Sequence, residues 1–372
     1  MKKIFFNIAT VLMAAAVIMS CHQEEYLPPN WNYDIPQTAL KRETQIGAFY
    51  INQTTGDWKS AQDYTPLLNL VYDEENDSTE NTPYNSTEHG ILTRQCLWAD
   101  EAGVDFFIFA YNNGSGDNGL ISAFEQYRED AKVRFIINYN FSHLKFDGQL
   151  TGEGPNFEAV VNDFKSLYES MFSGESYYHM PDGRPLIIFA GNNSSSYDYS
   201  RFIPAFRAAM ADYTAELQES DPEVADNALD FYIMGEVTTN WVAPQINEDS
   251  SRELDANYCK QWYPTSYYER WYCFYSFTDI AWQNWRDYAA GWGNDFVPCI
   301  YPEYYTTTNG ARAIERSAKG WTDFCNVGKR NMGSQGIILI NSWNDFSADT
   351  ALEPTVEYGT EYMQIARRQL KK

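Results

Sequence analysis

One local pattern repeats along most of this chain: a short apolar run, then a stretch with apolar residues at helical spacing. Most of the runs lack the alternation of apolar and polar residues that a half-exposed strand shows. Strands covered on both faces have this character, because neither face meets water. The runs cover residues 46–50, 104–110, 133–138, 186–190, 230–235, 274–277, 296–300 and 336–340. Runs that alternate with helices in this way predict a single (β/α)8 TIM barrel, an α/β fold.

The intervals between the runs carry the helical patterns. They predict helices at 86–102, 120–131, 156–172, 201–218, 280–291, 309–328 and 358–370. Pro298 lies inside one predicted strand and lacks the amide hydrogen that a central strand would donate, which is a conflict. The segment 241–272 is rich in Tyr and Trp and is predicted to be an insertion near the barrel mouth. The barrel domain is expected to span residues 44–372.

Residues 1–20 have the composition of an export signal. Lys2 and Lys3 precede an apolar stretch that is shorter than a typical membrane span, and a small residue ends it before Cys21. A small residue followed by cysteine resembles the bacterial lipobox, which implies cleavage before Cys21 and lipidation of that cysteine. An ordinary signal peptide with an incidental cysteine is the alternative.

The expected lipid anchor also predicts a location. Acyl chains on Cys21 would attach the protein to a membrane without a spanning helix. Residues 21–43 hold Pro28, Pro29 and Pro36 and no clear period, so they are predicted to be a tether. An acidic pair soon after the cysteine resembles the surface-export signal of Bacteroidetes-type lipoproteins. We therefore expect the protein on a bacterial cell envelope membrane, at the outer membrane or the cell surface.

The charge balance restricts the class of partner. The formal net charge is −24, which argues against nucleic acid, because phosphates require basic patches. It also argues against broad contact with an anionic lipid surface. Aromatic residues make up 16% of the chain, and flat rings with a polar tip suit the faces and hydroxyl rims of sugars. A large aromatic core is the alternative for any single ring. A neutral carbohydrate is the expected substrate.

Cysteine and histidine usage argues against a metal site. After Cys21, five cysteines remain and no CxxC pair occurs, so neither a disulfide framework nor a zinc site is indicated. A single bridge between Cys259 and Cys273 stays open as an alternative. The 4 histidines lack metal-ligand spacing, and no phosphate-binding motif occurs. We predict no metal and no cofactor.

Barrel enzymes keep their chemistry at the carboxyl ends of the strands. Asn, Tyr, Trp and carboxylates dominate those ends, and their polar groups match sugar hydroxyls. The predicted substrate-binding residues are Tyr50, Asn112, Asn138, Trp343 and Asn344.

A glycosidase needs two carboxyl groups, one of which is usually held protonated. The candidates at the strand ends are Asp345, Asp349, Glu236 and Glu303. For Asp345 the alternative is a structural cap of the following loop. Glu353, which precedes Pro354, is expected to serve a salt bridge or a turn.

Three segments of the chain resemble WbsX-like proteins, which are related to glycoside hydrolase families 99 and 71. Residues 66–74 (PLLNLVYDE) and 102–109 (AGVDFFIF) resemble the first crossover of that family. Residues 296–302 (FVPCIYP) resemble its "fiPxxxPGwdnt.R" segment. Residues 341–362 resemble its pattern "AWNEWxEGxxLEPxxxYGxxYL". The resemblance implies a barrel fold over nearly the whole chain after the tether.

The resemblance also implies site residues. In family 99 the last motif supplies two glutamates: one deprotonates the sugar 2-hydroxyl, and the other is the general acid/base. The first falls on Asp345 and the second on Ala348, while Asp349 stands where the family has Gly. The motif is therefore degenerate, and an acid would have to come from Asp349, Glu236 or Glu303.

These observations predict a lipid-anchored, glycoside hydrolase-like protein. It would act on a neutral polysaccharide or glycan, and the resemblance to family 99 implies one of the mannose type. The alternative is a non-catalytic glycan-binding lipoprotein on the same barrel.

Overall fold

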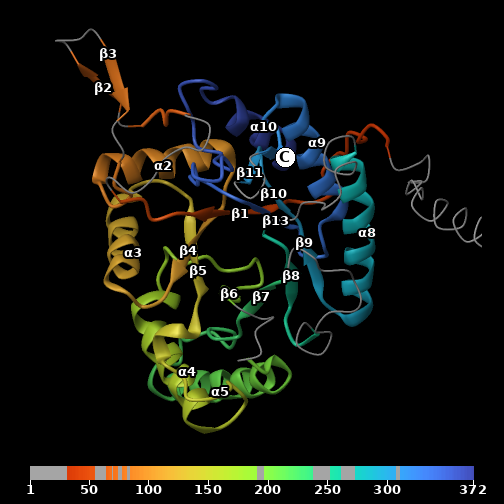
Figure 1. Ribbon diagram of the computed structural model, residues 1–372. Helices are drawn as coiled ribbons and strands as arrows, with labels where there is room; N and C mark the ends of the chain where they lie inside the picture. Colours follow the sequence, from red (N-terminus) through yellow and green to blue (C-terminus); the bar gives the residue numbers. More distant parts are fainter. Residues whose placement is uncertain are drawn as a thin grey trace, which may run out of the picture.

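The computed structural model describes residues 32–54, 64–68, 70–73, 78–81, 84–190, 197–237, 252–260, 273–306 and 311–372. The predicted signal peptide at 1–20 and the predicted lipidation site Cys21 lie outside these residues. A ring of parallel strands forms the centre of the molecule, and helices surround it (Figure 1). Among the described helices, none is long and apolar enough to cross a membrane.

The strands of the ring match the apolar runs of the sequence, with one exception. They are β1 (Gln45–Tyr50), β4 (Phe106–Tyr111), β5 (Arg134–Tyr139), β6 (Leu186–Phe189), β7 (Tyr232–Glu236), β8 (Ala256–Tyr258), β9 (Asp295–Val297), β10 (Cys299–Ile300) and β13 (Ile337–Ile340). Their hydrogen-bonded order is β10-β13-β1-β4-β5-β6-β7-β8-β9. All pairings in this sheet are parallel, which confirms the predicted barrel class.

Pro298 explains why the sheet has one strand more than a (β/α)8 barrel. It separates β9 from β10, which follow one another in the chain and act as two halves of one barrel strand. The first half pairs with β8 and the second with β13, so the ring closes through this position. The Pro298 carbonyl still accepts a hydrogen bond from the Leu339 amide at 2.8 Å. The conflict noted for a proline in a central strand is thus resolved by splitting the strand.

Seven helices are described around the ring. They are α2 (His89–Ala102), α3 (Ser115–Tyr127), α4 (Gly154–Leu167), α5 (Tyr199–Ser220), α8 (Phe274–Trp292), α9 (Ala318–Asn331) and α10 (Glu361–Leu370). A 3-10 turn (Phe141–Leu144) follows β5, and a π turn (Tyr168–Phe172) extends α4. Two hairpins lie outside the ring: β2 (Leu70–Asp73) with β3 (Ser78–Asn81), and β11 (Tyr304–Thr306) with β12 (Ala311–Ile314). The first projects away from the body (Figure 1).

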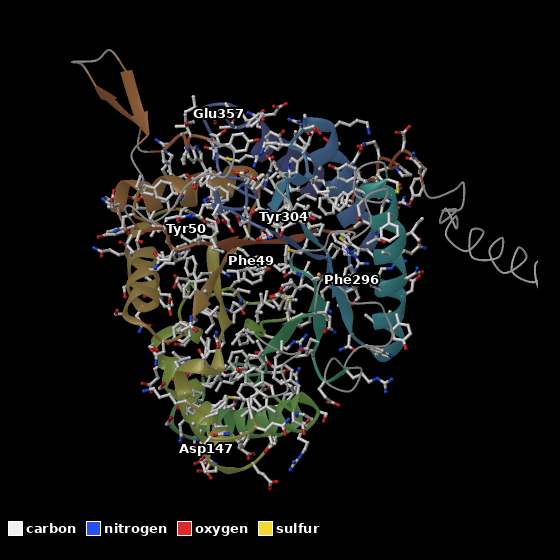
Figure 2. The ribbon with its side chains drawn as sticks, in the orientation of Figure 1. Phe49, Tyr50, Asp147, Phe296, Tyr304 and Glu357 are labelled. Atoms are coloured by element: carbon white, nitrogen blue, oxygen red, sulfur yellow. The ribbon has the colours of Figure 1, made fainter. Side chains whose placement is uncertain are left out.

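The predicted strand at 274–277 is wrong, because these residues form the first turn of α8. The buried positions Phe274, Thr278, Trp282, Trp285 and Ala289 recur at helical spacing and turn one face of α8 toward the ring. Trp282 and Trp285 pack on Phe296 of β9. Phe296 is labelled in Figure 2.

The sixth barrel strand is β8, which lies inside the segment predicted to be an insertion. Of residues 241–272, only 252–260 are described, and these belong to the barrel wall. The rest of the predicted insertion lies outside the described residues.

The predicted helix at 309–328 begins too early. Residues 311–314 are strand β12, and α9 starts only at Ala318. Ser317 caps this start, because its hydroxyl accepts a hydrogen bond from the Gly320 amide.

Side-chain alternation decides which residues face the barrel interior. Gly47 leaves room inside for the Phe106 ring, since a Cβ on Gly47 would lie 2.3 Å from it. Phe107 and Phe109 point the other way and pack on Phe124 of α3. Residues paired in register share a face of a parallel sheet. The inward face therefore passes from Ile108 on β4 along the following sequence: Ile136, Asn138, Ile188, Met234, Glu236 and Tyr258.

The five described cysteines, Cys96, Cys259, Cys273, Cys299 and Cys325, are buried thiols. The alternative of a disulfide between Cys259 and Cys273 is wrong.

Candidate functional site

Inward-facing side chains gather where the strands end, at the mouth of the barrel. Phe49 near the end of β1 contributes a ring to the interior (Figure 2), and its centroid lies 5.8 Å from that of Tyr258 on β8. Glu236 ends β7 and is paired in register with Tyr258. Asn341 directly follows β13 and donates from Nδ2 to the Lys260 carbonyl oxygen at 3.3 Å. Carboxylate, phenol, amide and ammonium groups thus converge from β1, β7, β8 and β13.

Glu236 is the carboxyl group best placed for chemistry. It is half-buried, whereas the predicted alternatives Glu303 and Asp349 are fully buried. Burial raises the pKa of Glu236 above its ordinary value, while the positive charge of Lys260 opposes this rise. A carboxyl group with a raised pKa holds its proton closer to neutral pH, as a general acid must.

Lys260 links three strands at the mouth. Its ammonium nitrogen lies 4.5 Å from the centroid of the Phe49 ring, a cation–π contact. Its backbone carbonyl holds Asn341, and its charge acts on Glu236. Sequence reasoning missed Lys260 and Tyr258 because it did not recognise β8. The signal available was Tyr258-Cys259-Lys260, a polar side chain shortly after two apolar ones.

Asn138 presents an acceptor toward the interior. It is paired in register with Ala110 and Ile188, and its Oδ1 is buried without a hydrogen-bond partner among the described residues. An unsatisfied buried acceptor costs about 1–3 kcal/mol. A ligand hydroxyl would remove that cost. Asn112, at the end of the neighbouring β4, is exposed and accepts a hydrogen bond from the Ser142 hydroxyl at 3.4 Å.

Asp345 is half-buried in the loop after β13, where its carboxylate closes a tight turn. Its Oδ1 accepts hydrogen bonds from the Ser347 hydroxyl at 2.6 Å and from the Ala348 amide at 3.2 Å. Its own amide donates to the Ser342 hydroxyl at 2.7 Å. These contacts match the alternative of a structural cap, yet they use only one of the two carboxylate oxygens.

Glu303 and Asp349 belong to a buried brace under the same loop. Arg316 pairs with Glu303 (Nε to Oε2, 3.1 Å), and the side chains are 2% and 0% exposed. Arg316 also donates to the carbonyl oxygens of Asp349 and Ala351, at 3.0 and 2.8 Å. The Tyr64 hydroxyl adds a hydrogen bond to Glu303 at 2.9 Å. Arg316 and Tyr64 thus hold the Glu303 carboxylate, whereas Asp349 contributes its backbone carbonyl oxygen, and both side chains are buried.

The backbone of Asp349 has a conformation that suits the glycine found at this position in the family 99 motif. Its φ of 54° lies in the left-handed region, which glycine adopts most readily. Asp349 adopts this conformation although it is not a glycine, and its side chain is buried.

Tyr50 and Asn344 belong to a buried polar network around Glu353. The Glu353 Oε2 accepts from the Tyr84 hydroxyl at 2.8 Å and from Gln95 Nε2 at 2.9 Å. Tyr50 donates to Gln95 Oε1 at 2.6 Å. Asn344 donates to the Tyr84 hydroxyl at 3.3 Å. Burial raises the pKa of Glu353 to about 8.

The predicted sugar contacts of Tyr50, Trp343 and Asn344 find no support in this geometry. The amide of Asn344 is also bound to the backbone of Ile51, with Oδ1 accepting at 2.7 Å and Nδ2 donating at 3.0 Å. Trp343 is fully buried and packs on Phe107, with ring centroids 5.4 Å apart. All three side chains are buried.

The described part of the chain offers no metal site. Among the residues that the structure describes, no group of three or more His, Cys, Asp or Glu side chains is arranged to hold a metal ion.

Known structures share the fold of this chain. A glycoside hydrolase-like protein superimposes with a TM-score of 0.72 at 17% identity, over 91% of this chain and 97% of its own. The GH99 endo-alpha-mannosidase from Bacteroides thetaiotaomicron superimposes in two structures, with TM-scores of 0.59 and 0.54 at 16% and 15% identity. Each covers 88% of this chain and 96% of the mannosidase chain. No protein-family model and no curated protein sequence matches the chain. At these identities the likeness shows a glycoside hydrolase-like barrel fold.

Proposed function

We propose that this protein is a glycoside hydrolase that cleaves a neutral glycan at the mouth of its barrel. One observation carries the proposal: Glu236 is an inward-facing, half-buried carboxyl group with a raised pKa at the carboxyl end of a barrel strand. Such a group can hold the proton that the departing glycosidic oxygen requires.

In this mechanism two carboxyl groups divide the work. Glu236 donates its proton to the glycosidic oxygen as the bond to the sugar breaks. Asp345 accepts a proton from the attacking hydroxyl, either of water or of the sugar itself, through the oxygen that is not bound to Ser347 and Ala348. Asn138 and Asn112 hold sugar hydroxyls by neutral hydrogen bonds.

The finer points of the proposal rest on the sequence. The resemblance to WbsX-like proteins and to family 99 favours a mannose-type substrate, and a family 99 mannosidase shares the fold. The lipobox-like end of the export signal favours a lipid anchor at Cys21, and with it a place on the bacterial cell envelope.

A non-catalytic glycan-binding protein is the second candidate. The Asp345 turn favours it, because a carboxylate that closes its own loop can have a structural role without acting on a substrate. Glu236, Asn138 and Lys260 would then bind the glycan without breaking it.

Incubation with a panel of neutral glycans that includes a mannan separates the two candidates. The full chain and its Asp345→Asn variant would be compared, with new reducing ends and glycan binding measured in parallel. The hydrolase proposal expects new reducing ends from the wild type and at least about 10²-fold fewer from the variant. Binding by the wild type without any new reducing ends would leave only the glycan-binding function.

A further inference from the structure

A cationic cavity lies near the amino end of β1, away from the mouth. It has a volume of about 330 Å³ and is bordered by residues 37–40, the last turn of α9 and the end of α10. Four cationic side chains line it, and no acidic side chain does: Lys329, Arg368, Lys371 and Lys372. This is unexpected in a chain with a net charge of −24.

Lys329 is the central observation. Its side chain is only 7% exposed, and its ammonium group donates to Gln369 Oε1 at 2.9 Å. Among the described residues no carboxylate lies within ion-pair distance of it. An ammonium has three N–H donors, and buried charges are normally paired. Burial lowers the pKa of Lys329, as expected for a cation without a compensating anion.

The helix dipoles do not neutralise the positive charge of the side chains that line the cavity. The carboxyl ends of α9 and α10 each carry about −0.5 charge, roughly −1 together. Lys371 is ion-paired with Asp105 and also donates to the Thr44 carbonyl. The side chains of Lys329, Arg368 and Lys372 remain. They leave a net positive charge after the two helix ends and the backbone carboxylate of Lys372 are counted.

The walls of the cavity are fixed by hydrogen bonds. The Thr38 amide donates to Asn326 Oδ1 at 2.8 Å. The Asn326 Nδ2 donates to Gln37 Oε1 at 3.1 Å and to Gln369 Oε1 at 3.3 Å. Asn326 thus joins residues 37–38 to α9 and α10, and the cations are held around a defined space.

We propose that this cavity binds a phosphate group. The net positive charge suits a phosphate group, and ammonium and guanidinium groups donate charge-assisted hydrogen bonds to its oxygens. The described strand-end residues offer no such cluster, and the cavity lies near the amino end of β1, so the site is separate from the barrel mouth. The phosphate belongs either to a small soluble molecule or to a phospholipid headgroup, which share this chemistry.

Thermal unfolding of the full chain tests the proposal. Sodium phosphate would be titrated at constant ionic strength, with chloride as the balancing anion. The wild type is expected to gain Tm with phosphate, and Lys329→Met and Arg368→Gln to lose about tenfold or more in apparent affinity. Lys132→Gln, which removes an exposed cation elsewhere, should behave as the wild type.

Arg368 is exposed, so its variant keeps the test valid if Lys329→Met does not fold. A gain in Tm that is equal in wild type and Arg368→Gln, or no gain beyond chloride, would overturn the proposal. Lipid vesicles identify the source. Cosedimentation of the wild type, but not of Arg368→Gln, with vesicles that contain phosphatidic acid assigns a lipid headgroup. A gain in Tm with phosphate, without cosedimentation, assigns a soluble molecule.

Discussion

The burial of Glu236 and the charge of Lys260 determine the pH range in which Glu236, the proposed acid, carries its proton. Burial raises the pKa of Glu236, and the positive charge of Lys260 lowers it. A general acid must be protonated, so activity should fall as the pH rises through the raised pKa of Glu236.

Lys260→Met is the variant that separates this effect from simple damage. Removing the cation raises the pKa of Glu236 further, so the alkaline limb of the pH–rate profile should move to higher pH. Rates on a cleaved glycan across the pH range would measure it. An unchanged limb, or a shift to lower pH, would show that Glu236 is not the group that titrates.

Glu353 makes the stability of the fold depend on pH. Its pKa is about 8 in the folded protein, above the ordinary value of 4.5, so the folded state binds the proton more tightly than the unfolded state. The stability that this proton contributes is present at low pH and is lost as the pH rises from about 4.5 through 8.

Glu353→Gln should therefore stabilise the protein at pH 9 relative to wild type and change little at pH 5. The gain would be a few kcal/mol, at about 1.4 kcal/mol per pKa unit. Urea unfolding at both pH values measures the difference, with Glu357→Gln as an exposed control. Equal effects of Glu353→Gln at the two pH values would contradict a proton that Glu353 holds more tightly in the folded state.

At the scale of elements, the loop after β13 depends on Arg316. This residue joins Glu303, which follows β10, to the carbonyl oxygens of Asp349 and Ala351 in the loop. Its guanidinium also lies over the rings of Tyr358 and Tyr362. The proposed base, Asp345, therefore lies in a loop whose backbone is bound by Arg316 at Asp349 and Ala351.

Arg316→Met should lower the free energy of unfolding by about 3–5 kcal/mol, because Glu303 would be left as a buried charge without its cation. Lys165→Met, which breaks the surface pair with Glu216, should cost no more than about 1 kcal/mol. Urea unfolding measures both. A cost for Arg316→Met as small as that of the surface control would mean that the brace does not stabilise the loop.

The elements also show where sequence reasoning succeeds and fails. Seven apolar runs were predicted as strands and are strands, because burial on both faces leaves a continuous apolar signal. β8 was missed because it is only three residues long and has a polar residue, Asn257, at its centre. Its neighbours β7 and β9 pair with it on either side, and that stabilisation is not visible in the segment itself.

The candidate site was predictable in part for a related reason. Glu236 follows an apolar run, and its position at a strand end identifies it. The burial of Tyr50 and Asn344 was not predictable, because it depends on Tyr84, Gln95 and Glu353, which come together only in the fold. The two last residues are 258 positions apart in the chain.

At the scale of the whole molecule, the barrel separates two chemistries. The mouth combines a protonatable carboxyl group, a lysine and amides at the carboxyl ends of the strands. The cationic cavity lies near the amino end of β1, where the chain enters the barrel after residues 37–40. Residues 37–40, which border the cavity, follow the proposed anchor at Cys21 closely in the sequence.

The central claim is that Glu236 is the general acid of a glycosidase, and leaving-group dependence tests it most directly. On a glycan that the wild type cleaves, Glu236→Gln should lower kcat by about 10²–10⁴-fold, because the departing sugar oxygen needs a proton. On an aryl glycoside of the same sugar, whose phenolate leaves without protonation, the variant should retain most of its activity. Equal losses on both substrates, or wild-type rates on the glycan, would contradict the claim.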